Sequence, residues 1–177
     1  ATLQVEEGCT VRNNKNSNMR IGSVTGGGTL GGSHGWTVGN DSGQLNSFSG
    51  TIKGSLTKVG NNSLRLSGEN IFEGNTDIKN GSLVVSNIAK KISATGCGTL
   101  TIHNQGILTG AGYIENKKVI IASGGILRPG MNYLNSLRIK SDIEQQQGGI
   151  IEWQLNGNNS VSAIREVDEF HGVHSGD

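Results

Sequence analysis

Short apolar runs recur along the whole chain, and each ends at a glycine, asparagine or aspartate after about three to five residues. The pattern is clearest over residues 48–87, where Leu64-Arg65-Leu66 and Ser82-Leu83-Val84-Val85 are two such runs. Runs of this length are too short for an amphipathic helix, and turn residues at this frequency would break one. The pattern therefore predicts strands and turns in a cycle that restarts about every 20 residues, which is typical of a repeat protein.

Residues 48–87 contain Leu-Thr-Lys-x-Gly at 56–60, Leu-x-Leu-x-Gly-x-Asn at 64–70 and Gly-x-Leu at 81–83. In this order and at this spacing, the three pieces resemble the passenger-associated transport repeat of bacterial autotransporters, also called the autotransporter-associated β-strand repeat. Residues 124–139 resemble the Gly-Gly-x-Leu-x-Pro-Gly-x-Asn segment that is common after such repeats. The positions that match the repeat are Phe48, Gly50, Ile52, Gly54, Leu56, Thr57, Lys58, Gly60, Leu64, Leu66, Gly68, Asn70, Phe72, Gly74, Thr76, Gly81 and Leu83.

The resemblance implies an all-β chain, namely a right-handed parallel β-helix that is secreted or displayed on the cell surface of a Gram-negative bacterium. It implies no particular activity. At about 20–25 residues per coil, the 177 residues would form a solenoid of about seven or eight coils. We expect residues 1–177 to be a single β-helix fragment of a larger passenger. Within it, residues 48–87 are the best-matching repeat and residues 160–177 are an atypical tail or incomplete coil.

Neighbouring coils of the same larger chain are the first expected partner, because one coil alone cannot bury its inward residues. A host-surface protein or glycan is the second, following from the resemblance to surface-displayed passengers. The net charge is +1 and the charges are scattered, which argues against a nucleic-acid partner or a basic membrane-binding face. No apolar run approaches the roughly 18 residues of a membrane-spanning helix, and no signal peptide opens the chain. We therefore expect no direct membrane insertion of this segment, and targeting segments that lie outside it.

Cys9 and Cys97 would lie three or four rungs apart in a stack of coils, on the order of 14–19 Å at about 4.8 Å per rung. A disulfide needs Cα atoms within roughly 7 Å. The spacing therefore predicts no intramolecular bridge, and two small thiol side chains packed in or near the core. Lys58 falls in a strand, and we expect its stem to cover apolar surface while its charge stays in water.

Gly26, Gly28 and Gly31 have the spacing of a GxGxxG motif. A dinucleotide site would need a helix directly after the glycines, with its N-terminus at the phosphates. The residues that follow, 33–39, have instead the composition of a short strand. A tight turn between strands is therefore the favoured interpretation.

His171 and His174, close to Asp168 and Glu169, are candidate metal ligands. Two imidazoles three residues apart share a face only on a helix, and no cysteine completes the set. A polar, exposed tail is therefore favoured, and we predict no metal, no cofactor and no catalytic residue. The aspartates are too widely spread to predict the paired carboxylates of a glycosidase; they are Asp41, Asp77, Asp142, Asp168 and Asp177.

Trp36, Tyr113 and Tyr133 are the candidate ligand-binding residues, because exposed aromatic rings stack on the apolar faces of sugars. Stacking or capping roles at coil corners are the alternative for all three. Two functions follow. The favoured one is a structural and interaction β-helix that supports adhesion and assists export of an autotransporter passenger. The alternative is a carbohydrate-binding or carbohydrate-active, lyase-like β-helix module.

Overall fold

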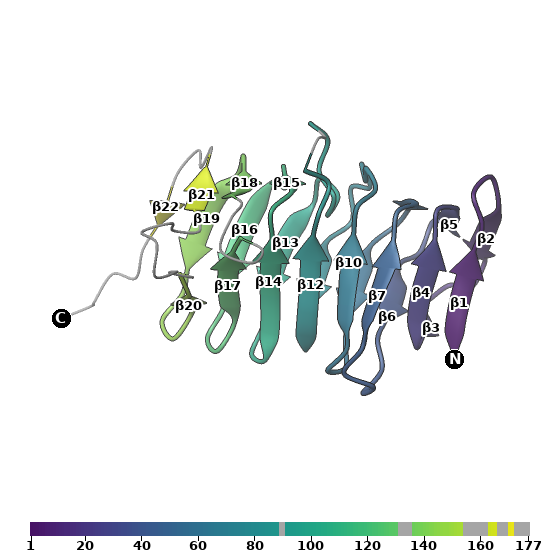
Figure 1. Ribbon diagram of the computed structural model, residues 1–177, viewed down its shortest axis with the longest axis horizontal. Coiled ribbons are helices and arrows are strands. Elements are labelled where there is room, and N and C mark those ends of the chain that lie inside the picture. The colour runs from purple at the N-terminus through teal and green to yellow at the C-terminus, as the bar shows by residue number, and fades with distance from the viewer. Residues whose placement is uncertain (89–90, 131–135, 154–162, 166–169, 172–177) are drawn as a thin grey trace.

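The computed structural model is a solenoid of parallel strands (Figure 1). It describes residues 1–88, 91–130, 136–153, 163–165 and 170–171, and in the last two ranges the backbone alone. These residues contain no helix. They therefore contain no helix that is long and apolar enough to cross a membrane. Each coil contributes one strand to each of two long faces, and a third face closes the cross-section in part of the molecule.

The two long faces are eight-stranded sheets, in which each strand pairs with the equivalent strand of the next coil. The first face consists of β1 (Thr2–Val5), β4 (Ser23–Gly26), β7 (Leu45–Phe48), β10 (Ser63–Leu66), β12 (Gly81–Val85), β14 (Gly106–Gly110), β17 (Ile126–Pro129) and β20 (Ile150–Ile151). The second face consists of β3 (Met19–Ile21), β6 (Trp36–Val38), β9 (Leu56–Lys58), β11 (Thr76–Ile78), β13 (Thr99–Ile102), β16 (Lys118–Ile121), β19 (Asp142–Gln145) and β22 (Phe170–His171).

The third face is split into two three-stranded sheets. The N-terminal small sheet consists of β2 (Thr10–Asn13), β5 (Thr29–Gly32) and β8 (Thr51–Ile52). The C-terminal small sheet consists of β15 (Tyr113–Ile114), β18 (Ser136–Ile139) and β21 (Ala163–Arg165). Within residues 160–177, the structure describes β21 and β22, and these two strands extend the solenoid by pairing with β18 and β19.

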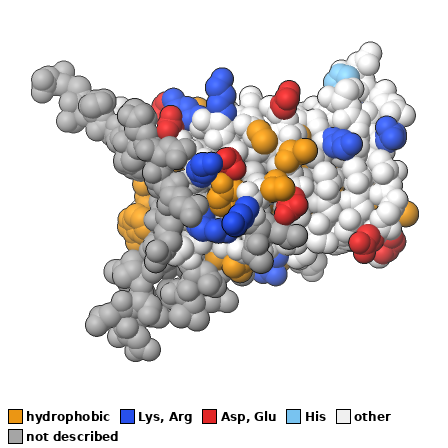
Figure 2. Space-filling view, turned by 90° about the horizontal axis from the view of Figure 1, so that it is seen from above, with side chains coloured by type: hydrophobic (Ala, Val, Ile, Leu, Met, Phe, Trp, Pro, Cys, Tyr) orange, Lys and Arg blue, Asp and Glu red, His pale blue; other side chains and the backbone are white. Residues whose placement is uncertain are grey.

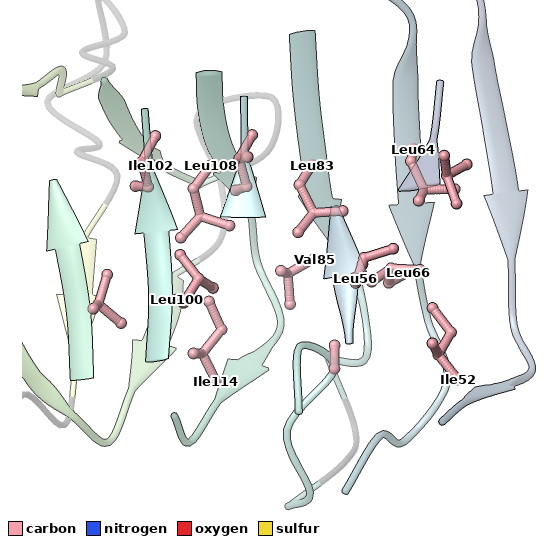
Figure 3. Packing of buried hydrophobic residues seen from close by; sticks show 14 of the residues in the cluster. Ile52, Leu56, Leu64, Leu66, Leu83, Val85, Leu100, Ile102, Leu108 and Ile114 are labelled. Atoms are coloured by element: carbon pink, nitrogen blue, oxygen red, sulfur yellow. The ribbon is translucent and has the colours of Figure 1, made fainter. Parts of the chain in front are cut away.

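Columns of like residues fill the interior. Leu64 of β10 lies in register with Leu83 of β12, and the column continues through Leu108 of β14 to Leu127 of β17. All four side chains are fully buried, and Figure 3 shows the first three pointing into the space between the sheets. Because neighbouring strands are about 4.8 Å apart, each leucine contacts the next one in the column. The contacts exclude water at about 25 cal/mol per Å² of apolar surface.

The prediction of a parallel β-helix is confirmed, and the solenoid has about seven turns. The alternation in the sequence is the reason. In β10, Leu64 and Leu66 are buried while Ser63 and Arg65 are only partly covered. Successive side chains of a strand point to opposite faces of its sheet, so this pattern places one apolar set inside every coil.

The GxGxxG spacing forms a tight turn, as the sequence analysis favoured. Gly26 ends β4 with φ at +101°, a conformation that favours glycine. A side chain on Gly28 would meet the Glu6 carbonyl, because an added Cβ would lie 2.3 Å from that oxygen. The close approach of neighbouring coils therefore requires Gly26 and Gly28, and the segment leads into strand β5, which contains Gly31, rather than into a helix.

Cys9 and Cys97 are both free. The prediction that they pack in or near the core is wrong, because both residues are exposed. Each lies in a turn rather than in a strand, where its backbone still bonds to the next coil: the Thr29 N–H donates to the Cys9 carbonyl at 2.8 Å, and the Lys117 N–H donates to the Cys97 carbonyl at 2.8 Å.

Candidate functional site

The third face is interrupted in the middle of the solenoid. Between the two small sheets, two coils cross this face as residues 67–75 and 86–98. The described residues of these two segments form no strand. The backbone of these coils still approaches its neighbours, so its buried polar groups need other hydrogen-bond partners. Two buried asparagines, Asn70 and Asn87, supply them.

Asn70 bridges the break on its N-terminal side. Its Oδ1 accepts a hydrogen bond from the backbone N–H of Ile52 in β8 at 2.6 Å, and its Nδ2 donates to the backbone carbonyl of Ala94 at 2.8 Å. A carboxamide carries the same donor and acceptor groups as a peptide unit. The side chain therefore replaces the backbone groups that a strand between β8 and the coil of Ala94 would provide.

Asn87 has the equivalent role on the C-terminal side. Its Oδ1 accepts from the backbone N–H of Tyr113 at 2.8 Å, and its Nδ2 lies 3.3 Å from the carbonyl of the same residue. Nδ2 also donates to the carbonyl of Ile92 at 2.8 Å. Tyr113 opens β15, so Asn87 pairs with the edge of the C-terminal small sheet as a strand residue would.

The strandless coils expose apolar side chains. Ile71 is 69% exposed, and Ile88 and Ile92 are exposed as well. Figure 2 views the molecule from this side and shows hydrophobic side chains gathered near the middle of the face, with acidic side chains beside them. A hollow of about 680 Å³ lies here, lined by Asn18, Ser33, His34, Gly35, Thr51, Ile52, Lys53, Gly54, Ser55, Ile71, Phe72, Glu73 and Gly74. We call it the apolar hollow.

A second hollow lies nearer the N-terminus and is polar. Its volume is about 540 Å³, and the residues that line it include Arg12, Lys53 and His34. It adjoins the apolar hollow, because Ser33, His34 and Lys53 line both. We call it the basic notch. In Figure 2, Lys or Arg side chains and a histidine lie towards this end of the face.

The C-terminal small sheet carries a network around Tyr113. The Arg138 guanidinium lies 5.2 Å from the centre of the Tyr113 ring, and the Tyr113 hydroxyl donates to Glu115 at 2.9 Å. Lys140 donates to the same carboxylate at 2.9 Å. The hydrogen bonds from Lys140 and then Tyr113 hold the pKa of Glu115 below its usual value.

Lys58 is the one lysine buried within the described residues, and the prediction that its charge stays in water is wrong. It lies in register between Val38 of β6 and Ile78 of β11, in an interior column. Its ammonium turns into the corner of the coil and donates to four oxygen atoms: Val59 O at 2.7 Å, Gly60 O at 2.9 Å, Asn62 Oδ1 at 3.0 Å and Asn80 O at 3.1 Å. Burial lowers the pKa of Lys58 from 10.5 to about 8, although the nearby Asp41 carboxylate raises it.

The two aromatic candidates that the structure describes, Trp36 and Tyr113, do not share an exposed surface. Trp36 has no exposed surface and lies in an interior column with Leu56. Tyr113 is 6% exposed and engaged by Arg138. Tyr133 lies outside the described residues. A sugar platform needs an open ring face, which Trp36 does not present.

The three candidate aspartates that the structure describes, Asp41, Asp77 and Asp142, lie on different coils. The Asp77 carboxylate lies 2.8 Å from Nε2 of His103, and Asp41 accepts from the backbone of Asn61. Asp142 lies in register with Lys118. The structure does not describe Asp168, Glu169, His174, Asp177 or the side chain of His171. In the part of the chain that it does describe, no group of three or more His, Cys, Asp and Glu side chains could hold a metal ion.

Sequence reasoning missed the residues that shape this face. Asn70 is part of the matched repeat motif, but its role as a backbone substitute became visible only with the strand register. Arg12 and Lys53 are far apart in sequence and belong to no motif. Comparisons of the chain with protein-family models, curated proteins and solved structures found no significant match.

We predict that Asn70→Ala lowers the free energy of unfolding by about 2–5 kcal/mol, because it leaves two buried backbone groups without partners. Urea denaturation followed by circular dichroism measures the change. Asn14→Ala is the control, since Asn14 is exposed, and it should shift stability by less than about 0.5 kcal/mol. Equal denaturation midpoints for the two variants would show that Asn70 does not bridge the break.

A second prediction concerns pH. The unfolded lysine keeps its proton up to its ordinary pKa, whereas folded Lys58 releases it near pH 8. Between these values the unfolded state binds more protons, so stability rises with pH. The free energy of unfolding, taken relative to Lys58→Met, should increase by at most about 3 kcal/mol from pH 7.5 to pH 10.5. If the difference in the free energy of unfolding between the wild type and Lys58→Met stayed constant or fell with pH, the four oxygen acceptors would be keeping the ammonium charged.

Proposed function

We propose that this chain is the structural and interaction β-helix of a surface-displayed or secreted passenger of the autotransporter type. The observation that carries the proposal is the continuity of the interior. Residues of each coil stack in register on those of the next, as Leu64, Leu83 and Leu108 do. Such a stack transmits rigidity along its axis, because every coil is held by its two neighbours.

A rigid rod is suited to holding an interaction surface away from a membrane. The two long faces continue from coil to coil, whereas the third face changes character along the axis, from the basic notch to the apolar hollow to the network around Tyr113. Exposed apolar surface bordered by polar residues is typical of interaction sites. We infer that the third face meets the partner, a host-surface protein or glycan.

The same stacking would assist export. A coil that emerges outside the cell can dock on the coil already folded there and bury its interior side chains. Each docked coil then opposes backward movement of the chain, because leaving would expose apolar surface again. The energy for outward movement would come from folding rather than from a nucleotide.

A second candidate function, carbohydrate binding, is favoured by one observation. The basic notch is lined by amide, hydroxyl and cationic groups, which are the groups that hydrogen-bond to sugars and their anionic substituents. This role is compatible with the first, since a glycan is one of the two partners named above.

The export prediction uses the full-length protein that contains these residues. Leu64→Asp together with Leu66→Asp places two carboxylates in the core and should slow the appearance of the chain at the cell surface several-fold. Accessibility to an added protease over time measures this appearance. Leu45→Asp together with Ser47→Asp is the matched control, because it adds the same charges at exposed positions of β7. Unchanged export of the core variant, or turnover of a polysaccharide by the wild-type chain, would contradict the proposed role.

A further inference from the structure

The basic notch is built by strand register. Arg12 of β2 lies opposite Gly31 of β5. Lys53 follows Ile52, which lies opposite Leu30, and the Lys53 N–H donates to the Leu30 carbonyl at 2.8 Å. Lys53 therefore falls in the same column as Arg12 and Gly31, on three successive coils. The two cationic residues are two rungs apart, or roughly 10 Å between backbones.

Gly31 lies between Arg12 and Lys53 in this column, beside Gly32, which lines the notch. Because it has no side chain, the space between Arg12 and Lys53 stays open. An added Cβ would lie 3.1 Å from Cγ2 of Thr10 and 3.6 Å from Cγ of Arg12. The backbone of Gly31 has no positive φ, so glycine is not required here by conformation. A longer side chain at this position would lie between the two cationic residues.

The two cations lack carboxylate partners. Within the described residues, neither Arg12 nor Lys53 forms an ion pair, and no acidic residue lines the notch. Three other cations of the described residues do pair with a carboxylate of a neighbouring coil: Arg128 with Glu152, Lys140 with Glu115 and Lys118 with Glu144. The notch therefore presents positive charge that nothing in the described structure neutralises.

A second column, of threonines, runs beside the cationic one. Thr10, Thr29 and Thr51 lie in register on the same three coils. Thr10 is exposed and the other two are half-buried. Each hydroxyl both donates and accepts hydrogen bonds. A row of hydroxyls next to separated cations matches a polyhydroxylated chain that carries anionic groups.

We propose that the basic notch binds the anionic group of an acidic polysaccharide, a carboxylate or a sulfate, with the sugar hydroxyls on the threonine column. Arg12 supplies a planar guanidinium that can hold either oxyanion through two hydrogen bonds, and Lys53 supplies a second charge from the opposite side. The proposal rests on the interaction role above and names its ligand class.

Nucleic acid fits the notch less well. Its binding draws on many phosphate contacts along a continuous basic track, whereas this chain has a net charge of only +1. The notch is short, and Glu73 lies in the adjoining apolar hollow. One anionic group at a time, spaced along a hydroxylated chain, satisfies the groups that are present.

The test measures binding of the chain to three probes by calorimetry: a short oligogalacturonate for carboxylate, a heparin-derived oligosaccharide for sulfate and a neutral maltooligosaccharide. At least one acidic probe should bind, more weakly in high salt, and the neutral probe should not. Arg12→Gln combined with Lys53→Gln should weaken that binding by at least about tenfold. Gly31→Leu, which keeps both charges and places a side chain between them, should weaken it as well.

Lys79→Gln is the matched control, because it removes an exposed lysine that directly follows β11, outside the notch, and should leave binding unchanged. Circular dichroism establishes that every variant is folded. The proposal is overturned if neither acidic probe binds, if the double variant binds like the wild type, or if a single-stranded oligonucleotide or anionic lipid vesicle binds the notch more tightly. Each of these outcomes leaves the export measurement untouched, so failure of the ligand assignment is distinct from failure of the structural role.

Discussion

Register between successive coils is the constraint on which the rest of this structure depends. Each backbone N–H and C=O of a strand pairs with the coil before or after it, and a shift by one residue would turn the whole interior set of a strand outward. Leu64, Leu83, Leu108 and Leu127 stay in one column only because every coil between them returns to the same position.

Polar residues inside the solenoid need hydrogen-bond partners inside it. Thr76 does so by donating to the Thr95 carbonyl at 2.8 Å, and Lys58 does so through its four oxygen acceptors.

The third face shows what happens where a strand is missing. The neighbouring backbone still has to be satisfied, and the side-chain amides of Asn70 and Asn87 take the place of peptide units. The coils held in this way are free to differ in length and sequence without disturbing the two long sheets. This freedom allows the exposed isoleucines and the apolar hollow to form on one side of an otherwise regular rod.

Much of the fold could be predicted from the sequence, because alternation and turn residues are local signals. The apolar positions of residues 48–87 predicted interior residues such as Leu64 and Leu66, and both are buried. The burial of Lys58 could not be predicted, because it depends on carbonyl groups of its own coil and of the next coil. The basic notch could not be predicted either, since the spacing between register partners differs from coil to coil. The burial of Trp36 likewise follows from register, and the exposure of Cys9 and Cys97 from their positions between strands, neither of which composition reveals.

Disulfide trapping tests the register most directly. Ser63 and Ser82 are register partners on β10 and β12, so their Cα atoms should be about 4.8 Å apart, within the range that a disulfide spans. In a chain with Cys9→Ser and Cys97→Ser, the pair Ser63→Cys and Ser82→Cys should form a disulfide on mild oxidation and keep the native circular dichroism spectrum. The pair Ser63→Cys and Val84→Cys, offset by two residues, should remain reduced. Preferential trapping of the offset pair, or equal trapping of both, would contradict the stacked columns on which this account rests.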